Sequence, residues 1–130
     1  MILRWSEDDL LNNTVELAMT CRWAVNHGRP ARTADGRWRT PIMGHKGFPD
    51  LVLARAGLVL FRELKGYDKR GRLGKLSGEQ RDWGKQLDPL WSPDRGAEQW
   101  ASGGPVFDVW TPDDWPLIQA TLTARARRTA

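Results

Sequence analysis

Residues 47–66, GFPDLVLARAGLVLFRELKG, hold two short apolar runs separated by an Ala-Gly pair. Val, Leu and Phe favour strands and the Ala-Gly pair favours a tight turn, so the stretch predicts an antiparallel hairpin with strands over 48–55 and 58–65. Pairing around this turn sets residues opposite each other when their numbers sum to about 113. Asp50 then lies opposite Glu63 to within one residue, and the hairpin brings two carboxylates together at one end.

Lys65 adds a positive charge to this pair. Side chains of a strand alternate between its two faces, so Glu63 and Lys65 project from the same face and Leu64 points into the core. Two carboxylates and the Leu64 carbonyl form an oxygen-rich site that suits Mg²⁺ or Mn²⁺, and a neighbouring ammonium can stabilise charge on a phosphate. In outline this is a site for phosphodiester hydrolysis. The alternative is a surface hairpin on which Asp50, Glu63 and Lys65 are solvated or salt-bridged.

Three segments carry helix signals. Ser6 followed by Asp9 resembles a capping box, and apolar residues at steps of three and four predict a helix over about 7–22. A second helix is predicted to begin at Ser77. A third follows Thr111, which acts as its cap, with proline at the first helical position.

The remaining segments alternate between strands and loops. PVFDVW at 105–110 predicts a third clear strand, and WAVNH at 23–27 could be another. Residues 28–47 are rich in Gly, Pro and Arg and predict a loop, residues 66–76 form a basic loop, and residues 88–104 form an irregular insertion. The order α-β-β-β-α-β-α predicts an α/β domain with a mixed central sheet flanked by helices.

Length and composition narrow the class of protein. The 130 residues fit one domain, and a net charge of +4 with a pI near 9.7 favours an anionic partner such as nucleic acid. A mean hydropathy of -0.58 argues against a membrane protein. Cys21 is the single cysteine, which excludes an intrachain disulfide and a cysteine-based zinc site and suits a reducing cytoplasm.

Several short motifs occur together along the chain: GFPD before a strand, ELK at the end of the next, SGEQRDW at the start of a helix, and VFDVWTPDDW near the C-terminus. In this combination the chain resembles the virus-type replication-repair nuclease (VRR-NUC) domain of the PD-(D/E)xK nuclease superfamily, to which archaeal Holliday-junction resolvases also belong. The resemblance extends over most of the chain. It implies the restriction-endonuclease-like fold of that superfamily and a single nuclease domain over residues 1–130, with 88–104 longer than the usual link.

The resemblance also implies an activity, a Mg²⁺- or Mn²⁺-dependent endonuclease acting on DNA. Asp50 and Glu63 take the positions of the metal ligands, with the Leu64 carbonyl as a further ligand, and Lys65 takes the position of the catalytic lysine. Small standalone members resemble phage or prophage proteins, which implies a homodimer in the cytoplasm of a bacterial cell or of a phage-infected host.

Two further site residues follow from the family pattern, each with an alternative. Gln80 matches the family's glutamine after the catalytic strand, although Ser77 and Gln80 also form a capping box, so Gln80 could serve only its own helix. The family's acidic residue on the first helix corresponds best to Glu7 by its spacing to Trp23. Glu16 is the competing candidate and lies on roughly the opposite helix face.

Basic residues around the hairpin are candidates for DNA contacts. His45 and Lys46 precede the GFPD turn and could contact the scissile phosphate. Each contact between a basic side chain and a backbone phosphate should make DNA binding more salt-sensitive. The candidates for backbone contacts are Arg29, Arg32, Arg37, Arg39, Lys69, Arg70, Arg72 and Lys75, each with a solvated loop residue as the alternative.

These observations predict an endonuclease that cuts branched DNA, with four-way (Holliday) junctions as the leading substrate. Three alternatives remain open: a flap or nicking nuclease of the same fold, a DNA-binding module without catalysis, and a protein–protein adaptor.

Overall fold

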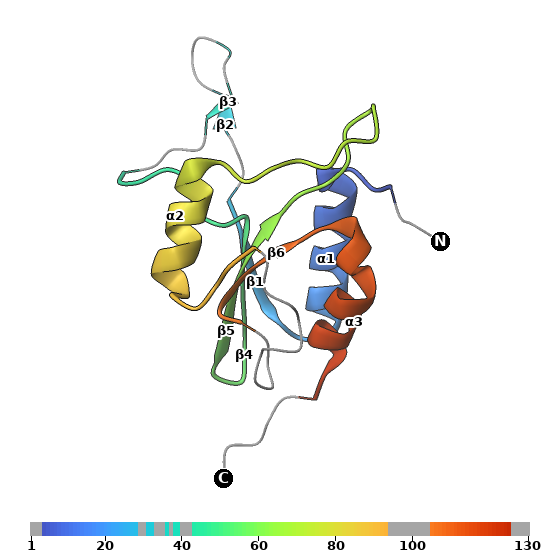
Figure 1. Ribbon diagram of the computed structural model, residues 1–130. Coiled ribbons are helices and arrows are strands. Elements are labelled where there is room, and N and C mark those ends of the chain that lie inside the picture. Colours follow the sequence, from blue (N-terminus) through green and yellow to red (C-terminus); the bar gives the residue numbers. More distant parts are fainter. Residues whose placement is uncertain are drawn as a thin grey trace.

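A four-stranded mixed sheet forms the centre of the computed structural model, with helices on both faces (Figure 1). The strands lie in the order β1 (Ala24–His27), β4 (Leu51–Arg55), β5 (Leu58–Leu64) and β6 (Phe107–Trp110). Strand β4 pairs antiparallel with both β1 and β5, and β6 pairs parallel with β5. The expected α/β class with a mixed sheet is confirmed.

The structure describes residues 4–28, 31–32, 36, 38–39, 43–93 and 105–125, with the side chains of 31–32 and 38–39 left out.

The β4–β5 hairpin has the predicted register. Its pairs run from Arg55 opposite Leu58 to Leu51 opposite Arg62. The turn residues Ala56 (φ 51°) and Gly57 (φ 82°) both adopt the left-handed conformation, as a two-residue turn between right-twisted strands requires. Strand β4 begins at Leu51, later than expected from the apolar run.

The first two helices begin at the predicted residues, whereas the third begins later than predicted. Helix α1 (Glu7–Thr20) has the capping box of Ser6 and Asp9, and it ends before residue 22, where Arg22 adopts a φ of 68°. Helix α2 (Gly78–Leu87) begins after Ser77. The last helix, α3 (Trp115–Thr123), follows a short 3-10 turn, η2 (Pro112–Asp114), capped by Thr111.

The core lies between the sheet and the helix pair α1 and α3. Because residues of a strand alternate, the even-numbered residues of β5 and the odd-numbered residues of β4 share this face. The buried apolar cluster includes Leu10 and Ala18 of α1, Leu51 and Leu53 of β4, Leu60 and Leu64 of β5, Trp110, and Ile118 and Leu122 of α3.

Helix α2 covers part of the opposite face, over β6. A Cβ atom at Gly84 would lie 2.5 Å from Cε1 of Phe107, so only glycine permits this close packing of α2 on the sheet. Helix α2 thereby lies beside the odd-numbered residues of β5, which include Glu63.

Two expected loops contain regular structure. Residues 28–47 include a two-stranded ribbon of β2 (Ala31–Arg32) and β3 (Trp38–Arg39), and residues 66–76 contain a bridge between Tyr67 and Leu73. Most of the expected insertion, residues 94–104, lies outside the described residues. Within the described part of the chain, no helix combines the length and apolar character needed to cross a bilayer.

Candidate active site

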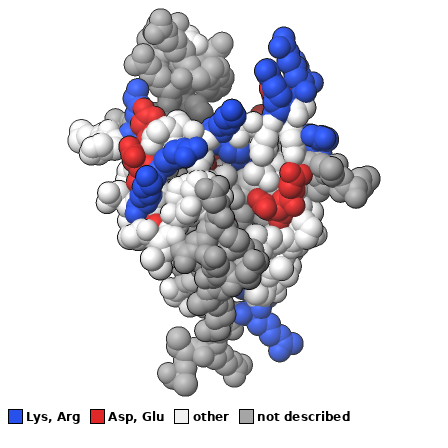
Figure 2. Space-filling view, in the orientation of Figure 1, with Lys and Arg blue, Asp and Glu red and all other residues white. Residues whose placement is uncertain are grey.

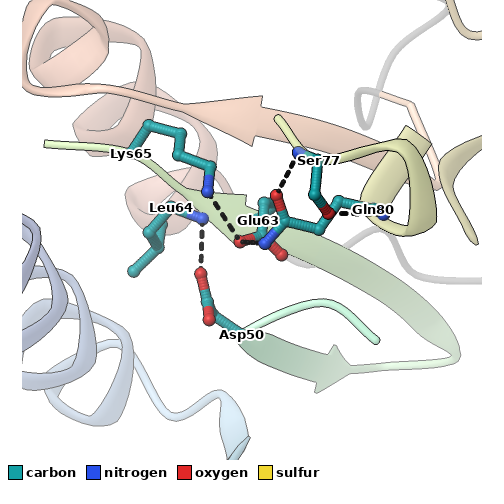
Figure 3. A network of polar contacts seen from close by, with 6 residues as sticks. All are labelled: Asp50, Glu63, Leu64, Lys65, Ser77 and Gln80. Carbon is teal, nitrogen blue, oxygen red and sulfur yellow. Dashed lines mark hydrogen bonds and ion pairs between the residues drawn. The ribbon is translucent and has the colours of Figure 1, made fainter. Parts of the chain in front are cut away.

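Asp50 and Glu63 meet at the end of the β4–β5 hairpin (Figure 3). Asp50 immediately precedes β4, and its Oδ2 accepts a hydrogen bond of 2.8 Å from the backbone N–H of Leu64. This bond fixes the Asp50 carboxylate against the last residue of β5. The predicted convergence of the two acidic residues is therefore present in the structure.

Glu63 is buried, with 2% of its surface exposed, and its two carboxylate oxygens have different surroundings. Oε1 accepts a hydrogen bond of 2.9 Å from Nε2 of Gln80, whereas Oε2 is buried with no hydrogen-bond partner among the described residues. The pKa of Glu63 is raised to about 9, first because the side chain is buried and then because the negative charge of Asp50 lies close to it. A proton or a cation at this position would therefore stabilise the pair.

Lys65 lies beside the acidic pair, on the same face as Glu63. Its Nζ is 3.7 Å from Oε1 of Glu63, and its side chain is only 14% exposed. Its backbone N–H donates to the carbonyl of Trp110, which continues the β5–β6 pairing beyond the last strand residue. The strand backbone thus directs the ammonium toward the carboxylates, and this positive charge lowers the pKa of Glu63.

Gln80 fills both of the roles that the sequence left open. Its Oε1 accepts a hydrogen bond of 2.9 Å from the N–H of Ser77, which completes the capping box of α2. Its Nε2 donates to Glu63, so the same amide group caps the start of the helix and holds Glu63 (Figure 3). Because the cap fixes the amide, Oε1 of Glu63 is held in one orientation.

Glu7 approaches the pair from the first turn of α1. Burial raises its pKa, the charge of Asp50 raises it further, and Lys65 lowers it. The approach depends on Gly66, where a Cβ atom would clash with the backbone N of Glu7. Glu7 and the competing candidate, Glu16, are both exposed at the surface, but Glu16 lies nine residues farther along α1. The structure therefore brings Glu7, and not Glu16, beside the two carboxylates.

A second glycine brings α2 to the site. Gly47 has a φ of 92°, and a Cβ atom there would lie 2.6 Å from the carbonyl carbon of Glu79 and 2.8 Å from the N of Gln80. The loop that leads to Asp50 therefore packs directly on the first turn of α2, which carries Gln80.

His27 is a contact that the sequence did not assign to the site. Its Nδ1 lies 2.9 Å from the carbonyl oxygen of Asp50. Because a carbonyl only accepts hydrogen bonds, Nδ1 carries the proton. The last pair of residues between β1 and β4 is His27 and Leu51. The side chain of His27 thus reaches the residue just before β4. The contact follows from β1 being the neighbour of β4, which no local motif indicates.

The donor set fits a hard divalent cation with an incomplete protein shell. In the described residues no group of three His, Cys, Asp or Glu side chains is close enough to form a complete site. Mg²⁺ commonly takes only one or two carboxylates from a protein and fills its shell with waters and substrate phosphates. The carboxylates of Glu63 and Asp50 provide such a partial shell, since Oε2 of Glu63 has no hydrogen-bond partner among the described residues and the charge of Asp50 lies close to Glu63. The Leu64 carbonyl is a further candidate, since in a strand it points to the same edge as the Leu64 N–H.

The predicted DNA contacts fall into three groups. His45 and Lys46 line a groove of about 770 Å³ along the side of α2 that includes Glu79 and Asp82, away from Gln80, so they do not join the carboxylates. Side chains of Lys69, Arg70, Arg72 and Lys75 are exposed after β5. The side chains of Arg29, Arg32, Arg37 and Arg39 lie outside the described residues.

Comparisons of the chain with protein-family models, with curated proteins and with solved structures give no match.

Proposed function

We propose that this chain is a divalent-metal-dependent DNA endonuclease of the PD-(D/E)xK type, with branched DNA as its substrate. The observation that carries the proposal is the buried carboxylate of Glu63 next to Asp50. One of its oxygens has no hydrogen-bond partner among the described residues, while Lys65 and Gln80 contact the other. A salt bridge that only stabilised the fold would leave no buried carboxylate without a cation. Here Lys65 can neutralise only one of the two neighbouring carboxylates, so a purely structural role does not account for the pair.

Each residue has a separate role in the proposed hydrolysis. A divalent cation would be held by Asp50, Glu63 and the Leu64 carbonyl, and when bound it supplies Lewis-acid chemistry to the phosphodiester and to an attacking water. Lys65 places a positive charge where negative charge develops on the phosphoryl oxygens. Gln80 orients Glu63, and the Leu64 N–H orients Asp50. The bond from the water oxygen to phosphorus forms as one P–O ester bond breaks.

The substrate preference rests on the resemblance to VRR-NUC domains. A four-way junction presents two equivalent strands, so we propose that the chain acts as a homodimer with one site for each strand. The basic net charge supports DNA as the partner, because it favours contact with backbone phosphates.

The test is cleavage of labelled four-way junction, flap, linear duplex and single strand in Mg²⁺ and in Mn²⁺. Asp50→Ala and Lys65→Ala should each lower the rate by at least about a hundredfold, which is the range for an electrostatic or acid–base group, while DNA affinity persists. Glu16→Gln, an exposed change on α1, is the matched control and should cut like the wild type.

Symmetric nicks on the junction alone would support the junction-cutting homodimer. Cutting of flaps or plain duplex would retain the nuclease and reject the junction preference. Binding without any cutting would favour the DNA-binding module. Wild-type cutting by Lys65→Ala or Asp50→Ala would reject the proposed site.

A further inference from the structure

The seven residues from Tyr67 to Leu73 form a tightly organised structure, here called the basic hairpin. Tyr67 and Leu73 pair as an antiparallel bridge, and the N–H of Asp68 donates to the Arg72 carbonyl at 2.9 Å. Gly71 has a φ of 74° and donates its N–H to the Asp68 carbonyl, which closes the turn. The segment is therefore a hairpin with a defined tip, although it is almost wholly exposed.

The carboxylate of Asp68 holds this tip together. Oδ1 accepts from the backbone N–H groups of Arg70 and Arg72, each at 2.9 Å, and Oδ2 accepts from Nε of Arg72 at 3.2 Å. These bonds lower the pKa of Asp68, with the Arg72 backbone N–H as the largest cause. The side chain of Arg72 is therefore paired within the hairpin. Its positive charge is balanced by Asp68, unlike the charges of Lys69 and Arg70.

The base of the basic hairpin is fixed to the body of the protein. The N–H of Gly74 donates to the Gly66 carbonyl, and the N–H of Tyr67 donates to the Trp5 carbonyl. The Tyr67 hydroxyl donates to Asp113 at 2.8 Å, and the guanidinium of Arg4 lies 4.8 Å from the Tyr67 ring centroid. The hairpin is held from both sides, and in Figure 1 it rises beyond the end of the sheet at the upper right.

Lys69 and Arg70 occupy the tip, and both are exposed. Neither forms an ion pair with another side chain in the part of the chain that the structure describes. Figure 2 shows Lys and Arg side chains projecting beyond the body in this region. Lys69 is four positions beyond Lys65, so their Cα atoms lie within roughly 14 Å of each other, which is about four phosphates of one strand along the duplex axis.

We propose that the basic hairpin is a preorganised arm that contacts DNA backbone phosphates beside the cleavage site, with Lys69 and Arg70 as the contact residues and Asp68 as a positioning residue. This inference rests on the proposed function and adds to it which basic residues contact DNA and why. A fixed hairpin holds two cations in place before the substrate arrives, so less conformational freedom is lost on binding. An acidic residue thereby strengthens binding to a polyanion.

The test compares variants of equal net charge. Asp68→Ala, Asp68→Asn and Glu16→Gln each remove one negative charge, so simple electrostatics predicts that all three bind DNA equally and more tightly than the wild type. The asparagine of the Asp68→Asn variant would retain an acceptor oxygen for the backbone N–H groups, whereas alanine removes it. We therefore expect Asp68→Ala to bind DNA severalfold more weakly than Asp68→Asn and Glu16→Gln.

Binding is measured by fluorescence anisotropy of labelled duplex and single-stranded DNA over a range of NaCl concentrations, with EDTA present to prevent cutting. The logarithm of the binding constant falls linearly with the logarithm of the salt concentration. In the double variant Lys69→Gln/Arg70→Gln this slope should become less steep by about 1.8 on duplex, or by about 1.4 on a single strand. The DNA form that shows the loss identifies the contacted phosphates as paired or unpaired.

Equal binding by Asp68→Ala and Asp68→Asn would overturn the positioning role, and an unchanged salt slope in the double variant would overturn the contact. Thermal melting of each variant checks that it is folded. Cleavage is assayed separately in Mg²⁺. A wild type that binds but does not cut would reject the proposed function alone, and a wild type that cuts while the two Asp68 variants bind equally would reject this inference alone.

Discussion

Glu63 is the residue at which stability and the proposed chemistry oppose each other. Its carboxylate is removed from water, and one of its oxygens has no hydrogen-bond donor among the described residues. Such a group destabilises a fold unless something binds it. The side chain nevertheless lies in a well-formed setting, with Gln80 and Lys65 on its other oxygen. A cost of this kind at a cation-binding position is expected, because the bound cation would offset it.

The pH dependence of stability should reveal this cost. The folded pKa of Glu63 is raised to about 9 from an ordinary value of 4.5, so between these values the folded chain keeps a proton that the unfolded chain releases. The contribution of Glu63 to the stability of the metal-free protein should therefore be largest below pH 4.5 and be lost progressively as the pH rises toward 9. Glu63→Gln should remove much of this loss and melt several degrees higher than the wild type at pH 8.5, while it abolishes cutting.

Thermal unfolding in EDTA at pH 5 and pH 8.5 measures this effect. Glu7 and Asp108 also have raised pKa values caused first by burial, so the wild-type slope contains their contributions as well. The difference between wild type and Glu63→Gln isolates Glu63. Parallel changes in the two proteins would contradict the prediction.

The double role of Gln80 can be separated by comparison with Ser77. Ser77→Ala removes the hydroxyl that accepts from the N–H of Gln80, and it leaves the contact with Glu63 in place. It should lower stability by about 1 kcal/mol and leave the Mg²⁺ concentration for half-maximal cutting unchanged. Gln80→Ala should lower stability by a similar amount and also raise that Mg²⁺ concentration severalfold. An equal Mg²⁺ requirement in both variants would reduce Gln80 to a helix cap.

At the scale of elements, two glycines determine how closely the helices approach the hairpin. Gly66 contacts the start of α1 and Gly47 contacts the start of α2, and in both places a Cβ atom would meet helix backbone. The two helix N-termini therefore meet the end of the hairpin from two sides. Glu7 and Gln80 are near the acidic pair because of these two backbone contacts.

Gly66→Ala tests this packing. The added methyl would displace α1 from the end of β5, because helix backbone cannot move aside as a flexible side chain can. We expect a loss of about 1–3 kcal/mol in the free energy of unfolding, together with reduced cutting. Gly28→Ala is the matched control, since no described residue lies within 4 Å of a Cβ atom there. Chemical denaturation of both variants gives the comparison, and equal stability would show that α1 can shift without cost.

The elements differ in how far sequence reasoning could predict them. The register of β4 and β5 follows from a two-residue turn, and the starts of α1 and α2 follow from capping boxes, so these local features were predicted and are confirmed. The alternation of side chains along β5 places Arg62 on the face opposite to Glu63, and indicates nothing more about it. It is fully buried, lies over the ring of Trp110 and donates to the carbonyls of Phe61 and Val106, and burial lowers its pKa to about 10. These contacts depend on β6, which is distant in sequence.

For the whole molecule, the sheet order decides which distant residues meet. The sequence predicts the four strands of the central sheet, but it does not state that β1 borders β4 or that β6 runs parallel to β5. The hydrogen bond from His27 to Asp50 depends on the first pairing, and the backbone contact from Lys65 to Trp110 depends on the second. The acidic pair was thus predictable from one hairpin, whereas its surroundings were not. The nuclease activity and the homodimer remain proposals at this scale.

The locality of the acidic pair bears on the order in which the molecule folds. A hairpin closes within about 1–10 μs, whereas the pairing of Phe61 with Phe107 must bring together segments far apart along the chain. Asp50 and Glu63 therefore come together while both are still hydrated and ionised. Only the later docking of α1 and α2 removes Glu63 from water. Near neutral pH and without metal, the last stage of folding should consequently take up a proton from solution.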